Sequence, residues 1–185
     1  MGFHTYPLER AAALDDPGRY RYCSREELAD AILEGPKGTV LDLGCGTGFF
    51  TNDIARFVDR IIAVDIQPEM LELLLKNSPP SNVHPVASSI DHLPIASGSV
   101  SVAFSTMTFH EYATPAAHAE VKRVLQPDGL LVAIDWTRDG SGESGPALDE
   151  RYNVKMAVDQ LQTAGYHIVE TATRPETFVV IARVA

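Results

Sequence analysis

The 185-residue sequence lacks several features that would mark a secreted, membrane-spanning or nucleic-acid-binding chain. Its only cysteines, Cys23 and Cys45, cannot build a disulfide framework, which favours a reducing, cytoplasmic location. No apolar run approaches the roughly 20 residues that span a bilayer, and the N-terminus has no basic and apolar leader of the secretory type. The formal charge is −10 with no cluster of Lys and Arg, so neither nucleic acid nor an anionic membrane is an expected partner.

What the sequence does contain is a regular alternation of apolar strand-like and helix-like segments. Strands are predicted at 39–43, 60–66, 83–88, 100–106 and 130–136, and helices at 24–34, 49–58, 68–77, 115–125 and about 153–163. A hairpin of 166–172 with 177–184 is predicted at the end of this sequence. This order predicts an α/β fold with a doubly wound sheet between helices, a three-layer α/β/α sandwich whose C-terminal hairpin adds an antiparallel strand.

We expect a single domain over residues 1–185, because the length suits one hydrophobic core. Within it, 1–35 forms an N-terminal helical or lid segment, 36–136 the ligand-binding core, and 137–185 a crossover loop, a helix and the terminal hairpin.

The stretch LDLGCGTGFF, residues 41–50, follows the first predicted strand and is rich in glycine. Ligands of open α/β sheets bind outside the carboxyl ends of the strands, and Gly44 and Gly46 let a ligand approach the backbone closely. The spacing is G-x-G-x-G rather than the dinucleotide pattern G-x-G-x-x-G, and Asp42 stands just ahead of it. A pyrophosphate beside Asp42 would meet like charge. A cationic ligand without phosphate, such as S-adenosylmethionine, suits the turn better.

Asp65 supplies a second signal at the end of the next strand, 21 residues after Gly44. That is about the separation at which an acidic residue meets a nucleotide ribose, and a carboxylate accepts hydrogen bonds from both ribose hydroxyls. The two signals together favour S-adenosylmethionine. A nicotinamide or flavin cofactor, or a pocket that has lost its ligand, remains the alternative.

Four stretches, VLDLGCGTGFFT, AVDIQPEML, IDHLPIASGSVSVAFSTMTFHEY and EVKRVLQPDGLLVAIDW, resemble the class I S-adenosylmethionine-dependent methyltransferases, and within them the type 11 subgroup. The resemblance runs from about residue 38 to 136 and implies a Rossmann-like, seven-stranded sheet. It also implies that Asp42 and the turn Gly44, Cys45 and Gly46 hold the methionine part of the cofactor. Asp65 would then hold the ribose, and Ile66 would pack on the adenine.

The same resemblance places further contacts after the third and fourth strands. The family usually has an acid for the adenine amino group, and here the matching stretch carries Ser89 and Ile90, so that a serine hydroxyl replaces the carboxylate. Thr106 and Met107, at the end of the fourth strand, are expected near the transferred methyl group. The product would be S-adenosylhomocysteine.

His110 and Glu111 are the candidates for catalysis, because they follow the fourth strand. An imidazole beside a carboxylate can remove a proton from a methyl acceptor near neutral pH. The alternative is structural, with His110 capping carbonyl groups and Glu111 beginning a helix. A metal site with His118 is not expected, because the spacing does not place the three side chains on one helical face.

Two segments are candidates for covering the pocket, residues 1–24 and 137–150. Each has a structural alternative, as a clasp on the sheet edge and as a solvated crossover loop. The expected function is methyl transfer to a small-molecule acceptor by a monomer or homodimer. Two alternatives remain, a non-catalytic S-adenosylmethionine-binding subunit that stabilises or activates a partner, and a nucleotide-dependent oxidoreductase.

Overall fold

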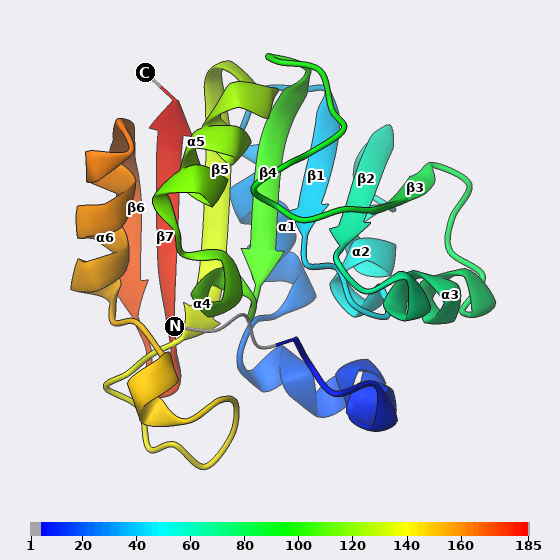
Figure 1. The fold of residues 1–185 in the computed structure, drawn as a ribbon, viewed down its shortest axis with the longest axis horizontal. Coiled ribbons are helices and arrows are strands. Elements are labelled where there is room, and N and C mark those ends of the chain that lie inside the picture. The colour runs from blue at the N-terminus through cyan, green and yellow to red at the C-terminus, as the bar shows by residue number, and fades with distance from the viewer. Residues whose placement is uncertain (1–4, 185) are drawn as a thin grey trace.

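A computed structural model describes residues 5–184, and Figure 1 shows their strands in one mixed sheet. The sheet has seven strands in the order β3-β2-β1-β4-β5-β7-β6. Their bounds are β1 Thr39–Leu43, β2 Arg60–Asp65, β3 Val83–Ala87, β4 Val100–Thr106, β5 Leu125–Trp136, β6 Tyr166–Thr173 and β7 Thr177–Val184. The predicted α/β class and its Rossmann-like, seven-stranded sheet are confirmed.

The first five strands pair in parallel, and only β7 runs against its neighbours β5 and β6. The chain starts at β1, moves outward to β3, and then returns to β4 on the other side of β1. The strand order therefore reverses between β1 and β4, which is where open sheets of this type bind ligands.

Helices cover both faces of the sheet, in agreement with the nearly continuous burial of residues in the central strands. One core layer joins the sheet to α1 Arg25–Leu33, α2 Phe49–Ile54 and α3 Pro68–Lys76, and the other joins it to α4 Phe109–Tyr112, α5 Pro115–Val124 and α6 Val154–Thr163. In β1, Val40 faces the first layer and Leu41 the second. The predicted three-layer sandwich is confirmed.

Two predicted elements differ in detail. The helix expected over 49–58 ends at Ile54, and the nitrogens of Arg56 and Phe57 then bond to carbonyl groups only three residues back. The side-chain amide of Asn82 donates 2.8 Å hydrogen bonds to the carbonyl groups of Ala55 and Val58 in this turn, where Phe57 is 46% exposed. The strand expected from 130 begins at Leu125, and its pairing with β4 is irregular between Leu125 and Leu130.

The N-terminal segment contains two 3-10 helices, η1 Leu8–Asp15 and η2 Pro17–Arg21, which lie beyond the carboxyl ends of the strands (Figure 1). A third, η3 Leu148–Glu150, interrupts the segment after β5. The part of the lid segment at residues 1–4 lies outside the described residues. Within 5–184, no helix combines the length and apolar character needed to cross a bilayer.

Candidate functional site

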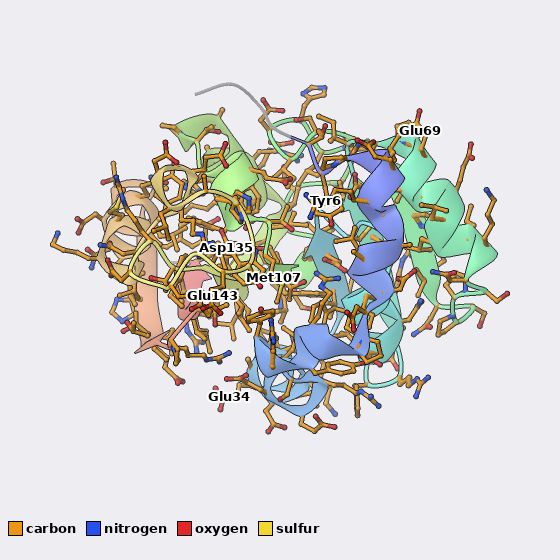
Figure 2. All side chains as sticks on the ribbon, turned by 90° about the horizontal axis from the view of Figure 1, so that it is seen from below. Tyr6, Glu34, Glu69, Met107, Asp135 and Glu143 are labelled. Carbon is orange, nitrogen blue, oxygen red and sulfur yellow. The ribbon has the colours of Figure 1, made fainter. Side chains whose placement is uncertain are left out.

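The candidate site lies at the carboxyl edge of the parallel strands, the edge seen from below in Figure 2. Three segments meet there: the turn after β1, the end of β2 and the turn after β4. The site residues that the sequence predicts on these segments therefore come together. Met107 and Asp135 lie near the middle of that view. Met107 has a positive φ of 62°, an uncommon backbone conformation for a side chain of this size that is found in functional turns.

The glycine turn is fixed to its neighbours by backbone geometry. The nitrogens of Gly44 and Cys45 both donate 2.9 Å hydrogen bonds to the carbonyl of Val64 in β2. Gly44 has a φ of 75°, and a Cβ atom there would lie 2.3 Å from the Thr108 methyl carbon. Gly44 is therefore required both by its backbone conformation and by the close approach of the β4 turn.

Asp42 is a buried carboxylate with one unused oxygen. Its Oδ2 atom accepts a 2.6 Å hydrogen bond from the hydroxyl of Thr51, whereas its buried Oδ1 atom has no partner. Burial raises the pKa of Asp42 to about 7, and the carboxylate of Asp65 adds to this increase, while Thr51 and Arg19 oppose it. An unpaired buried carboxylate oxygen is costly, so this site fits a cationic or donor group.

Asp65 connects β2 to the glycine turn. Its Oδ2 atom accepts a 2.8 Å hydrogen bond from the nitrogen of Gly46, and its Oδ1 atom accepts a 2.9 Å bond from the nitrogen of Gln67. Burial raises its pKa, and these backbone bonds partly offset the increase. Each oxygen retains acceptor capacity, because a carboxylate has about four lone-pair sites.

The remaining cofactor candidates surround this centre with different degrees of exposure. Ile66 is 42% exposed beside β2, and Ser89 and Ile90 are half-buried in the turn after β3. Thr106 is buried at the end of β4. Burial, with Asp42 and Asp65 nearby, raises the pKa of the Cys45 thiol well above its ordinary value, so this thiol is not a ready nucleophile.

His110 is the second residue of the short helix α4 and is held by Asp135 from strand β5. Its Nδ1 atom lies 2.9 and 3.0 Å from the two carboxylate oxygens of Asp135, and its backbone nitrogen donates a 2.7 Å bond to the same group. Burial alone lowers the pKa of His110, but Asp135, and then Glu111 and Glu150, raise it above its ordinary value.

Glu111 is the second catalytic candidate and lies beside the imidazole. Its Oε1 atom is 4.0 Å from Nε2 of His110. Burial raises the pKa of Glu111 to about 7, opposed by His110 and reinforced by Asp135 and Asp65. Glu111 therefore titrates near neutral pH beside an imidazole whose pKa is raised above its ordinary value.

The N-terminal segment covers the glycine turn. The hydroxyl of Thr47 donates a 2.6 Å hydrogen bond to Asp15, and a Cβ atom on Gly46 would lie 3.2 Å from a methyl carbon of Leu14. Arg19 donates to the carbonyl of Leu14 at 2.6 Å and contacts the sulfur of Met107 at 3.7 Å. Within the described residues, no carboxylate lies within ion-pair distance of Arg19.

The segment after β5 is organised by a fully buried arginine. Arg151 donates hydrogen bonds to the carbonyl groups of Thr137, Ser144 and Pro146, and its guanidinium lies 5.5 Å from the ring of Trp136. The glycine- and serine-rich loop is thus anchored at several points, which its composition did not predict.

Asp135, Arg19 and Arg151 were not identified from the sequence. A detectable signal existed for Asp135, an acidic residue inside the otherwise apolar stretch LLVAIDW. No local pattern in the sequence marked Arg19 or Arg151, whose hydrogen bonds go mainly to backbone carbonyl groups.

His118, the third residue of the metal site considered above, lies in the core rather than with His110. Its Nε2 atom is 3.1 Å from the side-chain oxygen of Gln160, and its ring stacks on Phe109. In the part of the chain that the structure describes, no group of three or more His, Cys, Asp or Glu is arranged to hold a metal ion.

A family model described as a methyltransferase domain matches residues 41–133. A methyltransferase-like protein of Schizosaccharomyces pombe is 40% identical over 113 residues, which are 60% of this chain and 43% of that protein. A malonyl-[acyl-carrier protein] O-methyltransferase of Hahella chejuensis is 33% identical over 112 residues, 58% of this chain and 39% of that one. The chain thus spans less than half the length of these curated relatives.

A crystal structure of a SAM dependent methyltransferase from Aquifex aeolicus is similar over almost the whole molecule. Its TM-score is 0.88 at 27% sequence identity, and the match covers 98% of this chain and 100% of that one.

Proposed function

Because the chain belongs to the family of S-adenosylmethionine-dependent methyltransferases, we propose that it transfers the methyl group of S-adenosylmethionine to a small-molecule acceptor and releases S-adenosylhomocysteine. The observation that carries the proposal is the unpartnered Oδ1 atom of Asp42, buried at the mouth of the glycine turn. The α-ammonium group of the cofactor matches this atom in charge and in hydrogen-bonding character.

The residues around Asp42 fit the rest of the cofactor. The turn Gly44, Cys45 and Gly46 presents backbone to the methionine part, and Asp65 has acceptor capacity left for the ribose hydroxyls. In the same proposal, Ile66 packs on the adenine ring, Ser89 and Ile90 lie at its amino edge, and Thr106 borders the methyl group.

Arg19 completes the recognition of the methionine part. Arg19 is half-buried and makes no ion pair with a described carboxylate, and its guanidinium contacts both the carbonyl of Leu14 and the sulfur of Met107. Electrostatic coupling between Arg19 and Asp42 supports their proximity. A free amino acid group carries both charges, so Asp42 would take its ammonium and Arg19 its carboxylate.

When bound, the cofactor supplies an electrophilic methyl group, and the chain's own residues align and deprotonate the acceptor. We assign His110 as the base and Glu111 as its carboxylate neighbour. A cavity of about 370 Å³ is lined by Tyr22, Glu143, Arg174 and neighbouring residues, but none of the cofactor or catalytic candidates lines it, so it is not assigned to the acceptor.

Residues 1–35 would close over the cofactor, 36–136 would hold it, and 137–185 would complete the acceptor side within one domain. Both cysteines are free thiols, which supports a cytoplasmic location. The alternative of a non-catalytic subunit is not favoured, because the arrangement of His110 with Asp135 and Glu111 serves proton transfer rather than cofactor binding.

Calorimetry with S-adenosylhomocysteine tests the proposed cofactor, and the expected result is saturable binding with no comparable binding of NADH. Asp42→Ala should weaken binding, while Asp91→Ala, an exposed acid outside the turn, should not. Binding of NADH by a protein that does not bind the adenosyl ligand would overturn the proposal.

A further inference from the structure

The imidazole of His110 is held on one side by a carboxylate that is completely buried. Both oxygens of Asp135 lie within 3.0 Å of His110 Nδ1, and they also accept backbone hydrogen bonds from His110 at 2.7 Å and from Trp136 at 2.8 Å. Because a carboxylate only accepts hydrogen bonds, the Nδ1 atom that faces it carries a proton. The neutral imidazole then has its lone pair on Nε2.

The Nε2 atom is free to act on another group. Glu111 Oε1 is 4.0 Å away, which is beyond hydrogen-bonding distance, and no hydrogen bond to Nε2 is formed within residues 5–184. The turn that carries His110 borders the glycine turn, because the hydroxyl of Thr108 donates to the carbonyl of Gly44 at 3.3 Å.

We infer that Asp135 is a positioning residue that keeps the proton of His110 on Nδ1, so that Nε2 takes the proton of a neutral hydroxyl or amine acceptor. The inference rests on the methyl-transfer function proposed above. In that step the acceptor's oxygen or nitrogen bonds to the methyl carbon, the electron pair of the broken carbon–sulfur bond stays on sulfur, and the acceptor's proton passes to Nε2.

The charges around His110 favour this acceptor class over carboxylates. The imidazolium formed on proton uptake would be surrounded by Asp135 of β5, Glu111 of α4 and Glu150 of η3, all of which stabilise a positive charge on the ring. Asp65 of β2 adds to the negative potential at Glu111. A carboxylate acceptor would be repelled by these groups, and in its ionised form it has no proton to give.

The tautomer of His110 tests the inference without any methyl acceptor. In protein labelled with ¹⁵N-histidine, the His110 signals are assigned by their loss in His110→Gln. Above the pKa of the ring, we expect Nδ1 to show the shift of a protonated nitrogen and Nε2 that of an unprotonated one. The opposite tautomer in the wild-type protein would overturn the inference, and this measurement needs no Asp135 variant.

Asp135→Asn removes the charge while keeping the shape of the side chain, and Asp139→Asn is its control because Asp139 is exposed in the following loop. In folded Asp135→Asn, we expect the pKa of His110 to fall by at least about one unit, because an ion-paired histidine loses its partner. The preference for one tautomer should fall with it. An unchanged tautomer and pKa in Asp135→Asn would contradict the positioning role.

Three ring-matched probes test the acceptor class: catechol, aniline and benzoate. With S-adenosylhomocysteine bound, the neutral probes catechol or aniline should shift the Nε2 signal of His110, and benzoate should not. The acceptor class would be overturned if only benzoate shifted the Nε2 signal. It would also be overturned if neither the hydroxyl nor the amine probe shifted that signal at saturation. Failure of the wild-type protein to bind S-adenosylhomocysteine would instead refute the proposed function, because the tautomer does not depend on that ligand.

Discussion

The carboxylate of Asp65 joins the second strand to the glycine turn, since its Oδ2 atom lies 2.8 Å from the backbone nitrogen of Gly46. The same side chain is proposed to hold the ribose. In this proposal, one residue would both shape the turn and bind the ligand.

Asp65→Ala should weaken the binding of S-adenosylhomocysteine by roughly 10- to 100-fold, since each lost charge-assisted hydrogen bond contributes about 1.5 to 3 kcal/mol. Asp59→Ala is the matched control, because Asp59 is exposed in the turn before β2. Calorimetry gives the affinities, and circular dichroism checks the fold. Equal affinities for the two variants would place the ribose elsewhere.

Binding of S-adenosylhomocysteine should also release a proton from Asp42. Its pKa of about 7 in the free protein should fall when an ammonium group pairs with it, so affinity increases with pH and levels off above pH 7. For a full shift, the affinity at pH 6 should be about 10-fold lower than at pH 8.

Calorimetry in buffers of different ionisation enthalpy measures this proton release directly. Asp42→Asn should abolish the proton release that comes from Asp42. Glu111→Gln removes the other carboxyl group with a pKa of about 7, and it should leave the proton release from Asp42 intact. A pH-independent affinity in the Glu111→Gln protein would show that Asp42 does not meet the cation.

Asp42 should also make the stability of the free protein depend on pH, and in the direction opposite to its effect on ligand affinity. Its folded pKa is raised above the ordinary value, so the folded state holds a proton that the unfolded state has lost between about pH 4 and 7. Stability without ligand should therefore decrease as pH rises through this window, and less so in Asp42→Asn. Urea unfolding at pH 5 and pH 8 makes the comparison.

Much of the fold, and the meeting of the glycine turn with Asp42 and Asp65, could be predicted from the sequence, because these signals are local. The glycine turn follows β1 directly, Asp42 lies near the end of β1, and Asp65 is the last residue of β2. The contact between His110 and Asp135 could not be predicted, because it depends on the pairing of β4 with β5.

Arg19 should determine whether the protein recognises the amino acid end of its ligand. Arg19→Gln should raise the Kd for S-adenosylhomocysteine roughly 10- to 100-fold, the effect of losing one charged hydrogen-bonded partner. It should leave the Kd for 5′-methylthioadenosine, which lacks that end, unchanged. Arg21→Gln is the control, because Arg21 is exposed on the same 3-10 helix. Equal losses for both ligands would indicate a structural role for Arg19.

The two segments at the carboxyl edge should respond differently to ligands. Residues 5–24 contact the glycine turn through Asp15 and Leu14, so the cofactor product alone should slow their hydrogen exchange. Residues 137–150 are already anchored by the buried Arg151, so they should gain protection only when an acceptor is also bound.

Arg151→Met tests that anchor. The change leaves carbonyl groups of the loop without their donor, which costs about 1 to 3 kcal/mol for each that stays buried. Exchange in 137–150 should then be faster in the free protein, while the affinity for S-adenosylhomocysteine stays within about twofold, because Arg151 lies outside the proposed cofactor contacts. Strand β6, at the far edge of the sheet, is the internal reference. Unaltered exchange in 137–150 on losing Arg151 would show that other contacts hold the loop.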